Sequence, residues 1–360
     1  MSLSEISLKF LENYLNNASP TSFEAAGQKL WLSYLSDAID DWFIDDYGTA
    51  VGVINPGKDY KVVIEAHADE ISWYVNYITD DGLIYVIRNG GSDHQIAPSK
   101  KVNLHGSKGV VRGVFGWPAI HTRQGDKEET PTQKNIFIDI GCTSKKEVLD
   151  LGVDVGTVIT YEDSFEILND RYFVGRALDN RMGGFVIAEV AKRLKRDKID
   201  LPFTLYVVNA VQEEIGLRGA EMIARRLQPD VAICIDVTHD TQTPMIDKKV
   251  EGDLKCGDGP VLAYGPAVQM NLLKHIEDVA QKNNISIQKN ACSRSTGTDT
   301  DAFAYSNAGT PSALISLPLR YMHTTVEMVH KDDVMACIDL MYHSIINIKN
   351  KQSFKYFDKI

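Results

Sequence analysis

The sequence contains no closely spaced cysteine pair. Its five cysteines are Cys142, Cys234, Cys256, Cys292 and Cys337. None of them forms the C-x-x-C spacing of a zinc knuckle or a redox pair. An odd, dispersed set predicts reduced thiols instead of a disulfide framework. A metal site held by cysteine sulfur is therefore not expected.

Long apolar runs and an excess of basic residues are also missing. No run reaches the roughly 18 apolar residues that a membrane-spanning helix needs. Residues 1–6 lack the basic and apolar regions of a signal peptide. The 49 acidic and 38 basic residues give a net charge of -11, which argues against binding to nucleic acid or to an anionic membrane. We therefore expect a cytoplasmic protein with neither kind of partner.

The chain alternates between amphipathic helices and nearly unbroken apolar strands. Its 360 residues, 44% of them hydrophobic, are enough for one large α/β domain and a smaller one. Helical spacing predicts helices over residues 4–16, 23–39, 182–195 and 331–349. Apolar runs predict a hairpin over 42–54 and strands over 61–66, 203–211, 230–240 and 312–318. This alternation is typical of an α/β fold.

Between residues 71 and 163 the pattern changes to short alternating strands. These are predicted over residues 73–78, 83–87, 110–115 and 135–140, with turn signals at Asp80–Gly82 and Asn89–Gly91. We therefore predict a small all-β domain, residues 71–163, inserted into an α/β domain made of residues 1–70 and 164–360. The charged segment 123–134 is predicted to be an exposed loop.

Two adjacent acids, Glu213 and Glu214, follow the apolar run 203–211. Such a run predicts a buried parallel strand, and α/β sheets keep their sites where these strands end. Neighbouring carboxylates in a poorly solvated cleft repel each other unless a cation or a proton compensates. One acid could then bind a metal while the other handles protons on a metal-bound water. The alternative is a solvated pair at the start of a helix, where the macrodipole favours acids.

His67 and Asp69 end another predicted strand, and Asp179 precedes the predicted helix 182–195. A metal-binding histidine commonly donates its second ring N–H to a carboxylate, a role that Asp69 could fill. A polar surface turn is the alternative for this pair. For Asp179 the alternative is a helix N-cap.

Asp236 and His323 follow two further apolar runs. Combined with His67, Asp179 and the acid pair, they form a mixed set of histidines and carboxylates that suits zinc, cobalt or manganese. Five ligands and one free glutamate are enough for two metals that share a carboxylate and activate a bridging water. That chemistry is hydrolysis.

Six blocks carry a resemblance that covers nearly the whole chain. They are Ala66–Glu70, Gly175–Arg181, Gln212–Ala220, Ile235–Asp240, Thr296–Asp299 and Arg320–Val329. In this order they resemble the glutamyl aminopeptidase and tetrahedral, or deblocking, aminopeptidase family of dinuclear metallopeptidases, whose members have often been labelled cellulases or endoglucanases. The resemblance implies a zinc-exopeptidase-like (phosphorylase/hydrolase-like) mixed sheet flanked by helices, with a small inserted PDZ-like β domain for dimerisation.

The resemblance also implies a ligand set for two divalent metal ions per subunit. Asp179 would bridge the metals, His67 and Asp236 would complete one site, and Glu214 and His323 would complete the other. Zinc is the first expectation, with cobalt or manganese as alternatives.

The same resemblance implies that Glu213 is the general base and acid and that Asp69 orients His67. The substrates would be peptides that lose residues from a free N-terminus. Family members assemble from dimers into a hollow tetrahedral dodecamer, so we expect a homo-oligomer.

Three other functions fit parts of the sequence. An N-acyl amino acid or peptide deacylase would use the same two-metal core on blocked substrates. A glycosidase would use Glu213 and Glu214 as its acid pair, which must lie about 5 to 9.5 Å apart, and would leave His67 and His323 without a role. A scaffold protein built on the β domain would require the ligand set to be a relic.

Overall fold

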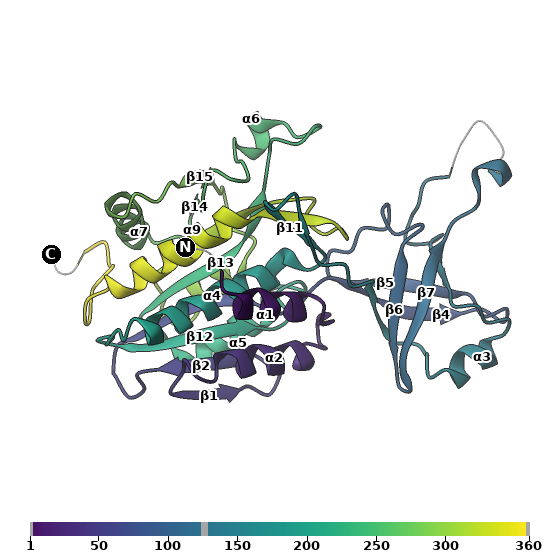
Figure 1. The fold of residues 1–360 in the computed structure, drawn as a ribbon, viewed down its shortest axis with the longest axis horizontal. Coiled ribbons are helices and arrows are strands. Elements are labelled where there is room, and N and C mark those ends of the chain that lie inside the picture. Colours follow the sequence, from purple (N-terminus) through teal and green to yellow (C-terminus); the bar gives the residue numbers. More distant parts are fainter. Residues whose placement is uncertain (1–2, 124–128, 358–360) are drawn as a thin grey trace.

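A mixed sheet of eleven strands forms the centre of the larger part of the molecule (Figure 1). The computed structural model describes residues 3–123 and 129–357. The strands follow the order β1-β2-β12-β3-β13-β16-β17-β11-β10, and β14 and β15 extend the sheet beside β16. Their bounds are β1 Asp41–Ile44, β2 Ala50–Ile54, β3 Lys61–His67, β10 Glu166–Leu168, β11 Tyr172–Gly175, β12 Thr204–Ala210, β13 Val231–His239, β14 Val261–Tyr264, β15 Gln288–Ala291, β16 Ser312–Arg320 and β17 Glu327–His330.

The four central strands β12, β3, β13 and β16 run parallel to one another. Nearly all of their residues are buried, which explains why their sequences are continuous apolar runs without alternation. Because they are parallel, their carboxyl ends lie at one edge of the sheet. Residues that follow these strands are thereby brought together.

Helices cover this sheet in two groups. In the first group, α4 packs against α1, α2 and α9 and lies on β3 and β13. In the second group, α5 and α8 contact each other and pack on β12, β13 and β16. The helices are α1 Glu5–Leu15, α2 Ala25–Leu35, α3 Lys145–Asp150, α4 Leu178–Arg196, α5 Arg218–Leu227, α6 Lys248–Glu251, α7 Met270–Lys282, α8 Asp299–Ala304 and α9 Lys331–Ile346, with a 3-10 turn at Ile120–Thr122. No described helix is long and apolar enough to cross a membrane.

A closed barrel projects from the α/β part, seen at the right of Figure 1. Its strands are β4 Ser72–Ile78, β5 Ile84–Asn89, β6 Lys101–Gly106, β7 Gly109–Gly116, β8 Phe137–Asp139 and β9 Val158–Tyr161. The barrel has a core of its own around Trp73, Phe115 and Ile138. Because the barrel is closed, it has no edge strand with unpaired backbone groups, and this stabilises so small an all-β unit. The prediction of a small inserted all-β domain is confirmed.

A buried arginine joins the two connections between barrel and sheet. The guanidinium of Arg176 bonds to Glu70, which follows β3, and to Asp163, which follows β9. Arg176 and Glu70 are both buried. A buried cation with two carboxylate partners holds both crossing segments in one geometry.

Most predicted elements are present, with two changes of boundary. The helix predicted over 23–39 forms only Ala25–Leu35, and the chain then turns into β1. The strand predicted over 230–240 spans Val231–His239, and it pairs with β16 as far as Leu319. Asp236 consequently lies within a strand and not beyond its end. Of the predicted loop 123–134, residues 124–128 lie outside the described part, and the flanking Glu129 and Lys134 are exposed.

Candidate functional site

The structure brings the predicted site residues together at the carboxyl edge of the parallel strands. Ligand atoms of His67, Asp179 and Asp236 lie within 4.8 Å of one another, and so do those of Asp179, Glu214 and His323. A cavity of about 480 Å³ is lined by all five and by Glu213. The residues therefore form two clusters that share one carboxylate.

Asp179 lies between the two histidines. Its Oδ1 is 3.2 Å from Nε2 of His67, and its Oδ2 is 3.3 Å from Nε2 of His323. Helix α4 is interrupted at Asp179 and Asn180, and the side chain that accepts a backbone N–H after this kink is Asn180, whose Oδ1 lies 3.0 Å from the N–H of Gly183. The capping alternative for Asp179 is thus wrong. Each of its oxygens faces a different cluster.

Glu213 and Glu214 point to opposite clusters although they are neighbours. Oε2 of Glu213 is 3.8 Å from Nε2 of His67, whereas Oε2 of Glu214 is 3.5 Å from Nε2 of His323. The residue before them, Gln212, has a φ of 58°, a left-handed conformation that costs energy for a non-glycine residue and is typical of functional sites. Helix α5 begins only at Arg218. The pair is therefore not the solvated start of a helix.

Asp69 holds both the imidazole and the acid pair. Its Oδ1 is 3.4 Å from Nδ1 of His67 and accepts a 2.9 Å hydrogen bond from the backbone N–H of Glu213. Its Oδ2 accepts from the backbone N–H of Glu214 at 3.2 Å and from the hydroxyl of Thr21 at 2.8 Å. The sequence predicted only the contact with His67. Nδ1 of His67 is also 3.2 Å from the backbone carbonyl oxygen of Asp69. Asp69 thus fixes the ring through its carbonyl and its carboxylate, and the carboxylate also fixes the turn that carries the two glutamates.

Two further residues shape the site and were not predicted. Glu327 is buried, and its two oxygens accept from the backbone N–H groups of His323 at 2.7 Å and Asp179 at 3.1 Å. The backbone of Gly91 lies against the imidazole of His323, so close that a Cβ there would be 2.5 Å from Nδ1. Glu327 belongs to the block Arg320–Val329, and Gly91 to a turn signal, but neither follows a strand at the spacing that marked the other residues.

The cavity carries more negative than positive groups. Four carboxylates face three imidazoles, those of His67, His239 and His323, and no lysine or arginine is among the described residues that line it. Burial, added to by Asp236 and opposed by His67, raises the pKa of Glu213 to about 10. Burial and the charge of Asp179 raise the pKa of Glu214 well above its ordinary value. Acids so placed need protons or cations to compensate them.

The carboxylates of the cavity also change the pKa of His67. Burial disfavours the charged form of His67, yet the neighbouring Glu213 and Asp179 raise its pKa well above the usual range. The donor set consists of imidazole nitrogens and carboxylate oxygens with no thiolate, which suits zinc, cobalt or manganese. Two compensating divalent cations, one per cluster, would fit both the donor types and the excess of negative charge.

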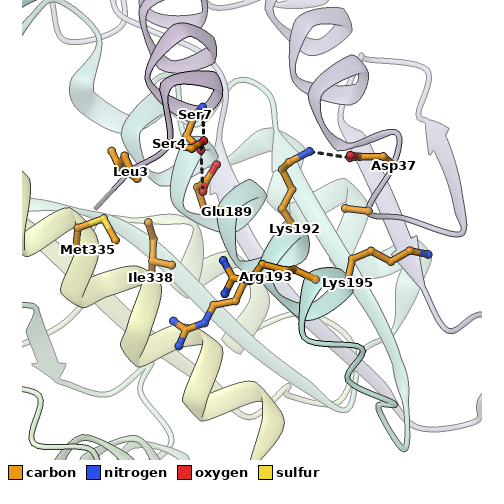
Figure 2. Close-up of a pocket in the computed structure, with 12 residues that line it drawn as sticks. Leu3, Ser4, Ser7, Asp37, Glu189, Lys192, Arg193, Lys195, Met335 and Ile338 are labelled. Atoms are coloured by element: carbon orange, nitrogen blue, oxygen red, sulfur yellow. Dashed lines mark hydrogen bonds and ion pairs between the residues drawn. The ribbon is translucent and has the colours of Figure 1, made fainter. Parts of the chain in front are cut away.

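A second cavity, of about 410 Å³, lies among α1, α4 and α9 (Figure 2). Its cations are largely neutralised by acids: Lys192 pairs with Asp37 at 2.7 Å, and Arg193 pairs with Asp339. It brings together no cluster of metal-binding groups in the described part of the chain. The acidic cavity is the candidate functional site.

Comparison with known proteins agrees with this geometry. Residues 48–340 match the family described as M42 glutamyl aminopeptidase. The chain is 31% identical over 335 residues to the lysyl aminopeptidase of Pyrococcus furiosus, covering 92% of this chain and 94% of that protein. It resembles the solved TET aminopeptidase of a marine sediment archaeon of the Thaumarchaeota, with a TM-score of 0.90, 28% identity and coverage of 95% of this chain and 96% of that one. The TET1 peptidase of Pyrococcus horikoshii, which can assemble into a tetrahedron or a large octahedral shell, matches with a TM-score of 0.84, 26% identity and coverage of 95% and 100%.

Proposed function

Since this chain belongs to the M42 glutamyl aminopeptidase family and is a metal-dependent aminopeptidase, we propose that the acidic cavity removes residues from the free N-terminus of peptides. The observation that carries this proposal is the position of Asp179, whose two oxygens lie 3.2 and 3.3 Å from the two imidazoles. A carboxylate that reaches both clusters can serve two metals at once.

The two clusters divide the ligands between two divalent metals. His67 and Asp236 would hold one metal, Glu214 and His323 the other, and Asp179 would be shared. Bound there, the metals would supply Lewis acidity that polarises the scissile carbonyl and makes a water more acidic. Zinc is the first choice, and cobalt and manganese suit the same donors.

Glu213 is the acid left over for proton transfer. It lines the cavity but belongs to neither ligand cluster. Its carboxylate would accept a proton from the attacking water and donate it to the leaving amine.

Asp69 acts through its neighbours as a positioning residue. It holds the ring of His67 and the backbone N–H groups of Glu213 and Glu214. This arrangement would hold the metal ligands His67 and Glu214 and the proton carrier Glu213 in fixed positions relative to one another.

We also propose that the inserted domain, residues 71–163, mediates dimerisation and that dimers can build larger shells. The inserted domain exposes several large apolar side chains that a partner subunit could cover, among them Tyr77, Val110, Ile120 and Val155. The tetrahedral and octahedral assemblies of the P. horikoshii TET1 peptidase support the larger shell.

The test uses one mixed-sequence peptide and its N-acetylated twin, incubated with metal-loaded protein with and without a chelator and followed by mass spectrometry. We expect stepwise loss of N-terminal residues from the free peptide only, abolished by chelation. Cleavage of the acetylated twin alone would identify a deacylase. Chelator-resistant cleavage of a β-glucan would instead support the glycosidase alternative.

A further inference from the structure

The part of the acidic cavity that lies beyond the metal ligands has a composition of its own. If the proposed function holds, the α-amine and the scissile bond of a substrate lie at the two clusters. The first side chain of the substrate must then occupy the remaining space. Its chemistry is set by the other residues of the wall, which are Leu217, Val237, Thr238, His239, Asn290, Thr296, Gly297, Thr298 and Met322, with Gly216 beside them.

Apart from the imidazole of His239, this wall contains no ionisable side chain among the described residues. Among the described lining residues, every aspartate and glutamate belongs to the two clusters or is Glu213, and none is lysine or arginine. A charged side chain entering this space would lose water without gaining an opposite charge. Burial of such an unpaired charge is strongly unfavourable.

The wall nevertheless presents polar groups. Within the described chain, no hydrogen bond engages the amide of Asn290 or the hydroxyl of Thr238. Both side chains are half-buried. An amide offers two donors and an acceptor, and a hydroxyl offers one donor and two acceptors. They can therefore bind a neutral polar group.

The segment of the wall from Thr296 to Thr298 is held in a fixed shape. The backbone N–H groups of Thr296 and Gly297 each donate to Asp301 at 3.0 Å. The hydroxyls of Thr296 and Thr298 lie 2.9 Å apart, and Thr298 accepts from the N–H of Thr300 at the start of α8. These bonds form before any substrate binds, so this wall is preorganised.

We propose that the preferred substrates are peptides whose N-terminal side chain is uncharged and ends in a hydrogen-bonding group, such as glutamine or asparagine, with Asn290 and Thr238 as the residues that select it. Met322 and Leu217 would contact the apolar stem of that side chain. Lysine, arginine, aspartate and glutamate at the N-terminus are the disfavoured residues.

The test is a competition among peptides that differ only in their first residue: glutamine, leucine, lysine or glutamate. Relative kcat/KM is read by mass spectrometry on the metal-loaded wild-type protein. We expect glutamine to exceed lysine and glutamate by at least about tenfold. Asn290→Asp should raise lysine relative to glutamine, and Asn290→Lys should raise glutamate. Asn284→Asp, an exposed change outside the cavity, should leave the ranking unchanged.

Thr238→Val provides a second test that keeps the β-branched shape, and it should reduce the ratio of glutamine to leucine. Efficient cleavage led by lysine or glutamate would overturn this inference while the aminopeptidase function stands. An unchanged ranking in Thr238→Val and in both folded Asn290 variants would do the same. Failure of wild-type protein to cleave any of the four peptides would overturn the proposed function and the inference with it.

Discussion

Gly91 lies so close to His323 that a Cβ at residue 91 would be 2.5 Å from Nδ1 of the imidazole. The backbone of Gly91 also helps to raise the pKa of that imidazole, which burial lowers. Gly91 follows β5 of the barrel, whereas His323 follows β16 of the central sheet. The inserted barrel therefore supplies part of the surroundings of a proposed metal ligand. Glycine is required here because of space, since no larger residue leaves room for the ring.

We predict that Gly91→Ala weakens one metal site more than the other. The added methyl group must displace the ring of His323, so the site of His323 and Glu214 should lose about 10- to 100-fold in affinity. The site of His67 and Asp236 should change little. Stepwise cobalt(II) titration, followed by visible absorption and calorimetry, measures both affinities. Gly141→Ala strains the barrel backbone at a position where a Cβ meets nothing within 4 Å, and serves as control. If Gly91→Ala bound metal at both sites with the affinities of the wild-type protein, the imidazole of His323 would tolerate the added methyl group.

Asp179→Asn and Asp236→Asn should differ in how many metals they affect. Asp179 faces both imidazoles, so its loss should weaken both metals. Asp236 belongs to one cluster, so its loss should weaken one. Metal content after dialysis against a weak chelator, measured by inductively coupled plasma mass spectrometry, distinguishes the two results. Loss of a single metal from Asp179→Asn would contradict the shared role.

Glu213→Gln should reduce kcat by about 10²- to 10⁴-fold, because an amide cannot carry the proton. The protein should still bind two metals, since Glu213 belongs to neither ligand cluster. Steady-state kinetics and metal analysis on the same preparation check both statements. Glu221→Gln, at a half-buried position of α5 outside the cavity, is the matched control. If Glu213→Gln bound only one metal, Glu213 would have to be counted as a ligand.

Asp333 predicts a pH dependence of stability away from the site. Burial, opposed by hydrogen bonds from the N–H groups of Gly257 and Gly259, raises the pKa of Asp333 to about 6. An unfolded aspartate has a pKa near 3.9, so the folded state binds the extra proton between these values. Stability should therefore fall by up to roughly 3 kcal/mol as pH rises from about 4 to about 6.

The comparison of wild type with Asp333→Asn isolates this contribution. Chemical unfolding of both proteins at pH 4.5, 5.5 and 6.5, each with chelator so that metal loss does not intervene, gives the two pH profiles. The difference in unfolding free energy between wild type and variant should change across this range and level off above about pH 6. Parallel profiles would show that Asp333 titrates no differently in the folded chain.

Local sequence determined most of the architecture around the site. The apolar runs that became β3, β12, β13 and β16 need both faces covered, and the sequence shows this directly. It also placed His67 and the Glu213–Glu214 pair at strand ends. The short alternating strands indicated a small all-β domain. Short or half-exposed elements were not predicted from the sequence. For example, Gln288–Ala291 is polar, and it forms the strand β15 by pairing with β14.

Tertiary structure alone decided which side chains meet. The order β12-β3-β13-β16 sets the distances among Asp179, the acid pair and the two histidines, and no local pattern contains that order. The same holds for Glu327, which ties the backbones of Asp179 and His323, and for Gly91, which the barrel delivers to the imidazole. Secondary structure follows from neighbouring residues along the chain. The site depends on strand pairing and loop paths between residues far apart in sequence, so it appears only once the sheet has formed.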